Sequence, residues 1–205
     1  MTTTIEYIKN LRAETGAGVL ECRRALEGTD YQYEAALVIL REAAVKRAAQ
    51  KEGRETGQGM VEVYTHAGGR LGVMVEVNCE TDFTARSERF RTFAHELALH
   101  IVSEDPLWVA DADIPAEILE EKRQKVTERA RAEGKPESLL IRIGEGAAKK
   151  FMDRNVLLRQ PSLRDETVTV GQMLSQVAGA VGENVTIRRF VRWELAETNE
   201  DKSAV

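Results

Sequence analysis

The apolar residues within the first fifty positions recur with the period of a helix. Thr3 and Glu6 have the spacing of a capping box, so the first helix is expected to begin there. Gly16 and Gly18 interrupt the pattern, because glycine adopts turn conformations that other residues avoid. Three short helices are therefore predicted, each with one apolar stripe. The stripes are Ile5, Ile8 and Leu11, then Val19, Cys22 and Leu26, then Tyr33, Leu37, Leu40 and Ala44.

The pattern changes after residue 59 from a helical period to a period of two. Glycines among polar neighbours mark residues 52–59 as a linker. Two alternating runs follow, Val61–Tyr64 and Leu71–Asn78, and the turn Ala67–Arg70 joins them into a predicted β-hairpin. A late run, Val185–Glu194, alternates in the same way. We expect it to join the hairpin in a three-stranded antiparallel sheet.

Most of the chain between the hairpin and the late strand has a helical pattern, which predicts an α+β protein with helices packed on the sheet. Four parts are expected along the chain. They are a three-helix module over residues 1–51, a linker over residues 52–59, an α+β core domain over residues 60–197, and a polar tail over residues 198–205.

Composition places the chain among ordinary globular proteins and argues against several function classes. Its net charge is −5, whereas nucleic-acid binders carry a basic stripe, so direct binding of nucleic acid is not expected. Apolar runs fall short of the roughly 18 residues that a membrane span needs, and the start lacks the features of a signal or transit peptide. Cys22 and Cys79 stand outside metal-binding spacings and are expected as buried, reduced thiols. We therefore expect a cytoplasmic protein that does not bind a membrane.

Candidate catalytic and metal-binding residues form no recognisable constellation in the sequence. The segment Gly144–Lys150 lacks the Gly-Lys-Ser/Thr ending of a phosphate loop, so direct nucleotide binding is not expected. His95 and His100 are five apart, whereas residues that share a metal on one helix face are three or four apart. Glu80 and Asp82 could form an acid/base or metal site, but no third ligand is nearby. We expect no enzymatic activity, no cofactor and no metal.

The end of the hairpin, Thr81-Asp82-Phe83, permits two interpretations. In one, Phe83 fills the core and Asp82 caps the following helix. In the other, Phe83 is an exposed aromatic anchor and Asp82 adds charge specificity. Taken alone, these residues favour the first interpretation.

Several motifs resemble, in the same order along the chain, those of the elongation factor Ts family. The longest is Val77–Phe83, and Leu11-Arg12 with Thr15–Gly18 is another. Together the motifs cover nearly the whole chain and favour the exposed interpretation of Phe83. The others are Cys22 with Ala25-Leu26, Ala85-Arg86, Gly134–Glu137, Leu157-Leu158 with Gln160-Pro161, Gly182–Asn184 and Arg189–Arg192.

The resemblance implies a guanine-nucleotide exchange factor that binds elongation factor Tu in translation elongation. It implies that the three-helix module is ubiquitin-associated-like in fold and touches the partner's nucleotide domain through Arg12 and its neighbours. It also implies that the Thr-Asp-Phe turn inserts between helices of that domain and disturbs the magnesium and phosphate end of the GDP site. GTP then resolves the complex. The predicted partner-binding residues are Thr81, Asp82, Phe83, Arg12, Glu80 and Arg86.

The chain departs from the family pattern at a few positions and in length. Val19-Leu20 stands where the family has methionines, Thr84 where it commonly has valine, and Ala196 where it has glycine. Longer members carry an inserted helical hairpin and a duplicated sheet subdomain, and neither is expected here. Without the second sheet subdomain, two alternatives stay open: the chain acts as a monomer, or it pairs with a second copy of itself as a homodimer.

Two other classes of function remain as alternatives to an exchange factor. One is an adaptor whose three-helix module binds a ubiquitin-like or other helical partner. The other is a small hydrolase whose site is assembled from residues far apart in the sequence.

Overall fold

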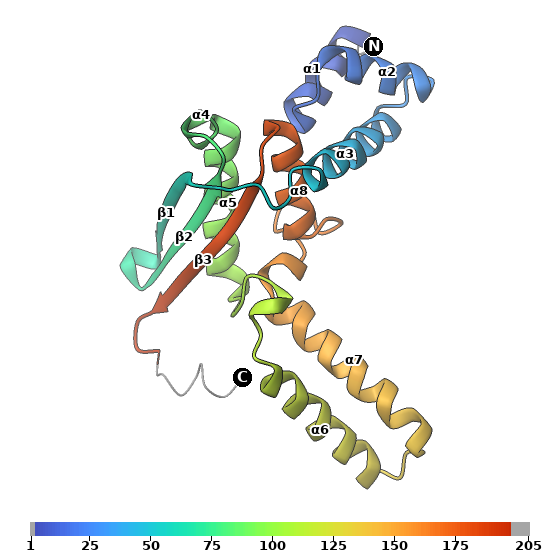
Figure 1. Ribbon diagram of the computed structural model, residues 1–205, viewed down its shortest axis with the longest axis vertical. Coiled ribbons are helices and arrows are strands. Elements are labelled where there is room, and N and C mark those ends of the chain that lie inside the picture. The colour runs from blue at the N-terminus through green and yellow to red at the C-terminus, as the bar shows by residue number, and fades with distance from the viewer. Residues whose placement is uncertain (1–2, 198–205) are drawn as a thin grey trace. The chain divides into compact units, whose positions relative to one another are not determined.

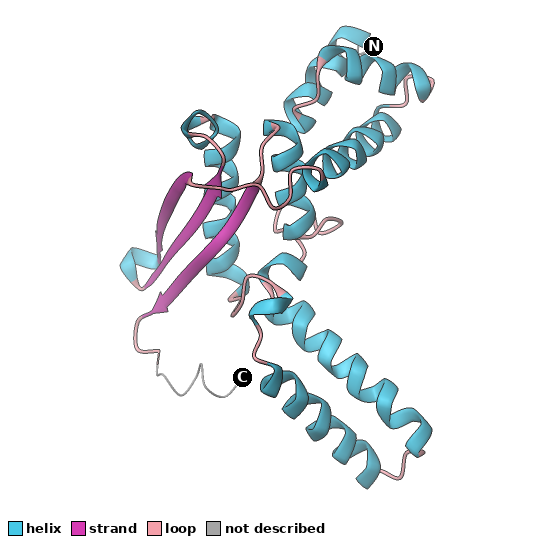
Figure 2. Cartoon of the chain, in the orientation of Figure 1, coloured by secondary structure: helices cyan, strands magenta, loops and turns pink. Residues whose placement is uncertain are grey.

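The computed structural model describes residues 3–197, which form two compact units. The first unit contains residues 3–63, 74–98 and 171–189, and the second contains residues 64–73, 99–170 and 190–197. The tail predicted over residues 198–205 lies outside the described residues. Helices and one three-stranded antiparallel sheet make up the fold, so the predicted α+β class is confirmed (Figure 2).

The sheet has the strand order β1-β2-β3. Strands β1 (Gln58–His66) and β2 (Leu71–Cys79) form the predicted hairpin, with a short 3-10 turn between them, and β3 (Val185–Glu194) pairs with β2. Alternate residues of β2 are buried, from Val73 to Cys79. The period of two in the sequence therefore indicates that one face of β2 lies against the core.

Three helices begin the first unit: α1 (Thr4–Thr15), α2 (Val19–Gly28) and α3 (Tyr33–Ala49). The predicted capping box of α1 is present, since the Thr3 hydroxyl accepts from the Glu6 amide and the Glu6 carboxylate accepts from the Thr3 amide. The three apolar stripes meet in one small cluster. Its buried members are Leu11, Ala17, Cys22, Ala25, Leu26, Ala36, Leu37 and Leu40.

Close contacts attach the three helices to α8 (Val170–Val181) within the first unit. A Cβ atom on Gly179 would lie only 2.1 Å from the carbonyl oxygen of Ala44 on α3. The side chain of Arg47 donates to the carbonyl of Gly179 at 3.3 Å, and that of Lys51 donates to the carbonyl of Gly182 at 2.7 Å. The backbones of α3 and α8 therefore meet without an intervening side chain at this point.

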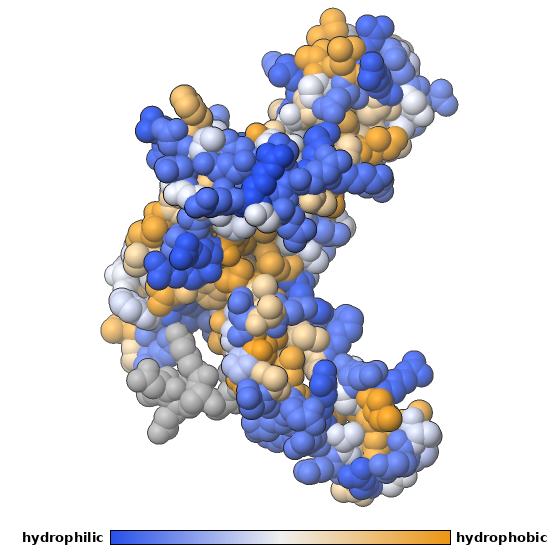
Figure 3. Space-filling view, viewed as in Figure 1, coloured by the Kyte–Doolittle hydropathy of each residue, from blue (hydrophilic) through white to orange (hydrophobic). Residues whose placement is uncertain are grey.

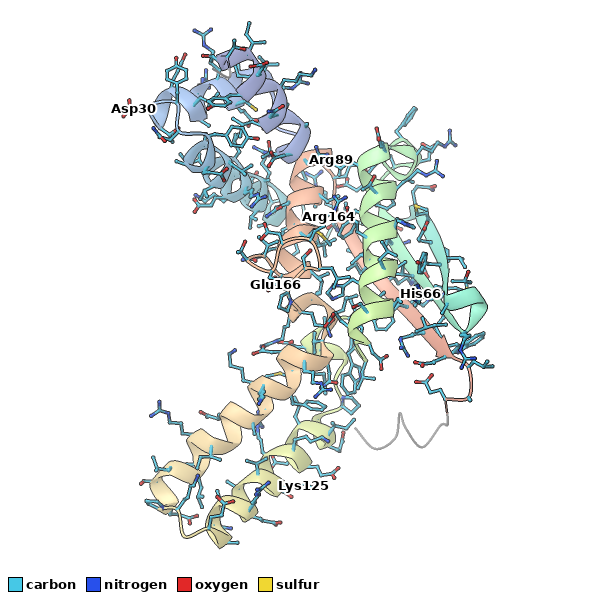
Figure 4. The ribbon with its side chains drawn as sticks, turned by 180° about the vertical axis from the view of Figure 1, so that it is seen from behind. Asp30, His66, Arg89, Lys125, Arg164 and Glu166 are labelled. Atoms are coloured by element: carbon cyan, nitrogen blue, oxygen red, sulfur yellow. The ribbon has the colours of Figure 1, made fainter. Side chains whose placement is uncertain are left out.

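Helices α4 (Asp82–Arg86) and α5 (Glu88–Glu104) follow the hairpin directly. Figures 1 and 4, which show opposite sides, both place α5 along one face of the sheet. Phe90, Phe93 and Leu97 on this helix are fully buried. Large aromatic side chains contribute heavily to core burial, so α5 fixes the position of the turn that precedes it.

The second unit contains a helical hairpin, α6 (Ala116–Ala132) and α7 (Glu137–Asn155), whose two helices pack against each other (Figure 1). The expectation that the chain has no helical hairpin was therefore wrong. Helix α7 runs without a break through Gly144 and Gly146. Gly144 packs against Arg123 on α6, where an added Cβ atom would lie 3.7 Å from the Arg123 Cβ, an ordinary contact distance.

The surface of the helical hairpin is mostly hydrophilic, with orange apolar groups near its tip (Figure 3). Leu139 and Ile141, close to that tip on α7, are among the exposed large apolar residues. Ion pairs on both helices, such as Arg129 with Glu133 at 3.1 Å, are exposed. Surface pairs of this kind are worth about 0–1 kcal/mol each, so the packing between the helices holds the hairpin together.

A buried polar network connects three segments of the second unit. The amide group of Gln160 donates to the carbonyl oxygens of Arg154 at 2.6 Å and Glu104 at 3.3 Å. Its oxygen lies 2.9 Å from Nε2 of His100, which must therefore donate. This arrangement leaves Nδ1 of His100 as an acceptor, and that atom has no hydrogen-bond partner among the described residues. Burial lowers the pKa of His100, although Gln160 and Glu104 oppose the shift.

The free energy of unfolding should fall as the pH drops below about 6.5, the ordinary pKa of histidine. Because the pKa of His100 is lower in the folded chain, the unfolded chain binds a proton first, and stability is lost as the pH falls. One such group contributes at most about 1.4 kcal/mol per pH unit. Urea unfolding at several pH values would measure the slope.

His100→Gln keeps a donor towards Gln160 and should flatten this slope. His66→Gln, at the exposed end of β1 (Figure 4), is the matched control and should leave the slope in place. A slope that is the same in wild type and His100→Gln would show that the buried imidazole is not its source.

Gly179→Ala should destabilise the first unit, although alanine normally favours a helix. The propensity gain is about 1 kcal/mol, whereas forcing a methyl group against the Ala44 carbonyl costs about 1–3 kcal/mol. Gly146→Ala on α7 is the matched control, because nothing lies within 4 Å of its added Cβ, and it should stabilise the chain. Chemical unfolding of both variants tests this, and stabilisation by both would contradict the close contact of α3 with α8.

Candidate partner-binding site

The sequence Thr81-Asp82-Phe83 starts helix α4, which the sequence patterns did not predict. The Thr81 hydroxyl accepts from the amide of Thr84 at 3.3 Å, so Thr81 is the N-cap. The alternative in which Asp82 caps the helix was therefore wrong. Asp82 lies in the first turn and Arg86 in the last, which suits the helix dipole at both ends.

Phe83 is 82 % exposed, the highest exposure among the large apolar side chains of the described residues. Its neighbour Thr84 is only 8 % exposed and anchors the inner face of α4. The interpretation in which Phe83 fills the core was therefore wrong, and the exposure expected of an anchor is observed. A buried Thr84 next to an exposed Phe83 fixes which side of the short helix faces the solvent.

Charged groups of opposite sign flank Phe83. The carboxylate of Asp82 lies 3.0 Å from the guanidinium of Arg86, and both side chains are largely exposed. Such a pair contributes about 0–1 kcal/mol, so it adds little to the stability of the helix. A pocket of about 340 Å³ opens beside this pair. Its lining residues are Gln58, Gly59, Met60, Asp82, Ala85, Arg86 and Arg91.

The turn is held in place by a segment a hundred positions away. One carboxylate oxygen of Glu183 accepts from the backbone amides of Glu80 at 3.1 Å and Thr81 at 3.0 Å, and the other accepts from the Thr81 hydroxyl at 2.6 Å. Burial alone would raise the pKa of Glu183. Hydrogen bonds from Thr81, Thr84 and the two amides outweigh burial and hold that pKa below its usual value.

The predicted contact residue Glu80 takes part in the same network. Its carboxylate accepts from the backbone amide of Asn184 at 2.6 Å and lies 3.6 Å from the guanidinium of Arg54. The Asn184 side chain in turn donates to the carbonyl of Arg54 at 2.7 Å. Glu80 is half-buried, so its charge is used within the chain and is less available to a partner than that of Asp82.

Arg12 lies on the exposed side of α1, near the end of that helix. Arg89, at the start of α5, donates to the last carbonyl oxygens of α1: those of Ala13 at 2.7 Å, Glu14 at 3.1 Å and Arg12 at 3.5 Å. Figure 4 labels Arg89 at this end of α5. Burial lowers the pKa of Arg89. The Arg89 side chain thus connects the end of α1, which bears Arg12, to the start of α5, the helix that follows α4 and its Phe83.

The sequence patterns missed Glu183 and Arg89, the two residues that position the predicted site. Glu183 stood in one of the motifs that resemble the family, but nothing local showed what it binds. Arg89 resembled an ordinary surface charge of an amphipathic helix. Both predicted thiols, Cys22 and Cys79, are free and buried as expected, and the thiol of Cys79 donates to the carbonyl of Thr81 at 3.1 Å.

Within residues 3–197, no three His, Cys, Asp or Glu side chains group together in a way that could hold a metal ion. None of the helices in this range is long and apolar enough to cross a bilayer. The fold and the site therefore define an α+β protein that presents an aromatic side chain to the solvent from a braced turn.

Comparison with known proteins extends this description to a family. A family profile described as Elongation factor TS matches residues 23–197, which include Phe83 and Glu183. Elongation factor Ts of Rubrobacter xylanophilus is 49 % identical over 95 % of this chain and 100 % of its own length. Those of Coprothermobacter proteolyticus and Carboxydothermus hydrogenoformans are 43 % and 42 % identical, over 96 % and 95 % of this chain and 100 % and 89 % of their own. The chain belongs to the elongation factor Ts family.

Arg89→Met should loosen the end of α1 while keeping most of the aliphatic volume. Hydrogen bonds that involve a charged group contribute about 1.5–3 kcal/mol, so a loss of that order is expected in the stability of the first unit. Hydrogen exchange of the α1 amides would measure it locally. Arg91→Met, an exposed neighbour on α5, is the control and should change little. Unchanged exchange in Arg89→Met would show that the guanidinium does not hold α1.

Proposed function

We propose that this chain is a guanine-nucleotide exchange factor that binds the GDP form of elongation factor Tu and promotes release of GDP. The proposal is supported by membership of the elongation factor Ts family over nearly the whole chain. The observation that carries its mechanism is the exposure of Phe83 on a turn fixed from both sides. The role is one of binding and release, without bond-making chemistry, a cofactor or a nucleotide held by this chain.

In this mechanism the turn Thr81-Asp82-Phe83 inserts between helices of the partner's nucleotide domain. The ring of Phe83 occupies apolar space there and displaces the elements that hold magnesium and the phosphates of GDP. Asp82 brings a negative charge to the same place. Arg86 pairs with Asp82 across one turn of α4, which offsets part of the cost of moving that carboxylate out of water.

The three helices within residues 1–51 provide a second contact with the same domain of the partner, with Arg12 as its predicted centre. We propose that residues 52–59, of which the last two already belong to β1, act as the linker and residues 60–197 as the core domain that carries the turn. The exposed side chains of Val19 and Leu20 at the start of α2 add apolar area to the module's surface. Exposed apolar groups that gather on one surface favour a contact with another protein.

The free energies show how the two contacts must share the task. Weakening the binding of GDP a thousandfold requires roughly 4 kcal/mol of differential binding. Burying one phenylalanine provides roughly 1.5–3 kcal/mol. Phe83 alone therefore falls short, and the wider interface has to supply the remainder. Because the coupling is reciprocal, GDP or GTP expels the factor as strongly as the factor expels nucleotide. GTP therefore resolves the complex.

Phe83→Ala should slow stimulated GDP release by roughly ten- to a hundredfold, the factor that corresponds to the loss of one buried ring. Docking should weaken much less, because the rest of the interface is unchanged. Release of a fluorescent GDP from purified elongation factor Tu, followed over a range of factor concentrations, separates the maximal rate from the affinity. Phe83 is exposed, so the variant should unfold at the same temperature as wild type.

Ile141→Ala is the matched control, because Ile141 is 74 % exposed but lies on α7, away in sequence from the turn. It should leave both the rate and the affinity unchanged. Wild-type rates with Phe83→Ala would reject the insertion mechanism. A wild-type chain that fails to accelerate GDP release would reject the exchange function itself and favour the adaptor alternative.

A further inference from the structure

We propose that Glu183 is a positioning residue for nucleotide exchange, holding the turn of Thr81–Phe83 in the conformation that presents Phe83 to the partner. The inference rests on the proposed function and adds to it a residue outside the predicted contact set. Glu183 lies in the segment between α8 and β3, and the turn lies between β2 and α4. Both segments belong to the first unit.

The carboxylate of Glu183 satisfies three donors of the turn at once. The amides of Glu80 and Thr81 point at one of its oxygens, at 3.1 and 3.0 Å, and the Thr81 hydroxyl points at the other, at 2.6 Å. Hydrogen bonds to a charged group are stronger than those between neutral groups. Two consecutive amides can share one acceptor only in a narrow range of backbone conformations, so the contact specifies the shape of the turn.

The contact is reciprocal between the two segments. While Glu183 accepts from the amides of Glu80 and Thr81, the carboxylate of Glu80 accepts from the amide of Asn184 at 2.6 Å. Each segment thus supplies an acid that binds the backbone of the other. This arrangement resembles a capping box, in which two residues exchange side-chain and backbone bonds, but it connects positions about a hundred residues apart.

The orientation of Phe83 depends on this contact through Thr81. The Thr81 hydroxyl donates to Glu183 and accepts from the amide of Thr84, so the two bonds place the N-cap of α4. Helix α4 has five residues, and an isolated helix that short does not hold its shape in water. Without Glu183, the cap loses its orientation, and Phe83 is presented in only a fraction of the molecules.

The test compares Glu183→Ala, Glu183→Gln, Phe83→Ala and the double variant Glu183→Ala/Phe83→Ala in stimulated release of fluorescent GDP. Glu183→Ala should lower the maximal rate by about tenfold, while the half-saturating concentration stays within about twofold of wild type. Glu183→Gln should keep most of the rate, because its oxygen still accepts from both amides and its NH₂ group can donate to the Thr81 hydroxyl. Rescue by glutamine distinguishes hydrogen bonding from the negative charge itself.

The double variant decides whether Glu183 acts through Phe83. If it does, the double variant is no slower than Phe83→Ala alone, because no ring remains to be positioned. If the two substitutions each slow the rate by their full factor in the double variant, Glu183 acts independently of Phe83. That result would overturn the inference. A wild-type rate in Glu183→Ala would also overturn it, while a slow Phe83→Ala in the same assay would leave the proposed function standing.

Folding is controlled in parallel with the exchange assay. Glu145→Ala, at an exposed carboxylate on α7, should match wild type in rate and in unfolding temperature. If Glu183→Ala does not fold, Glu183→Asp replaces it, since aspartate keeps the charge but is too short to reach both amides and the hydroxyl. It should show the same fall in maximal rate at nearly constant half-saturating concentration. A fall in affinity at an unchanged maximal rate would reject a positioning role.

Discussion

The backbone amides of Glu80 and Thr81 converge on the carboxylate of Glu183, and the conformation of the turn that bears Phe83 depends on that convergence. Within α4 itself few interactions hold the turn, because the helix is short and its one ion pair is exposed. Hydrogen bonds to a charged acceptor contribute about 1.5–3 kcal/mol each. The glutamate makes these bonds in one arrangement of the two segments and not in others, which is how it selects a conformation.

The C-terminal end of α8, which precedes Glu183, also contacts the three N-terminal helices. Gly179 admits the backbone of Ala44 to within a distance that no side chain would allow, and the carbonyl of Gly182 accepts from Lys51. A few residues at the end of one helix therefore position both surfaces that the proposed mechanism uses. Their roles differ physically, since Gly179 acts by the absence of a side chain and Glu183 by the bonds its side chain makes.

Sequence patterns predicted what depends on periodicity and missed what depends on distant pairing. The strand Leu71–Cys79 was predictable because each residue's face follows from its neighbours. The exposure of Phe83 was not, since local rules favoured the core, and only the resemblance to a family reversed that expectation. Helix α4 and the hydrogen bonds from Glu183 that hold its start were missed, because the acceptor of the Thr81 amide lies about a hundred residues away. The helical hairpin was misjudged because that expectation rested on the length of the chain, which does not show how two helices pair.

An exposed phenylalanine on a braced turn suits a factor that must bind and then leave. Ordering a flexible loop on binding would consume about 0.5–1.5 kcal/mol for each immobilised side chain, and that amount would be lost from the free energy available to expel GDP. A turn fixed in advance by Glu183 avoids this loss. In the proposed mechanism the free energy saved strengthens the nucleotide-free complex, in which the turn is inserted, and not the complex that still holds nucleotide. Ordering the turn in advance therefore increases the coupling between factor and nucleotide, and because that coupling is reciprocal, GTP still displaces the factor.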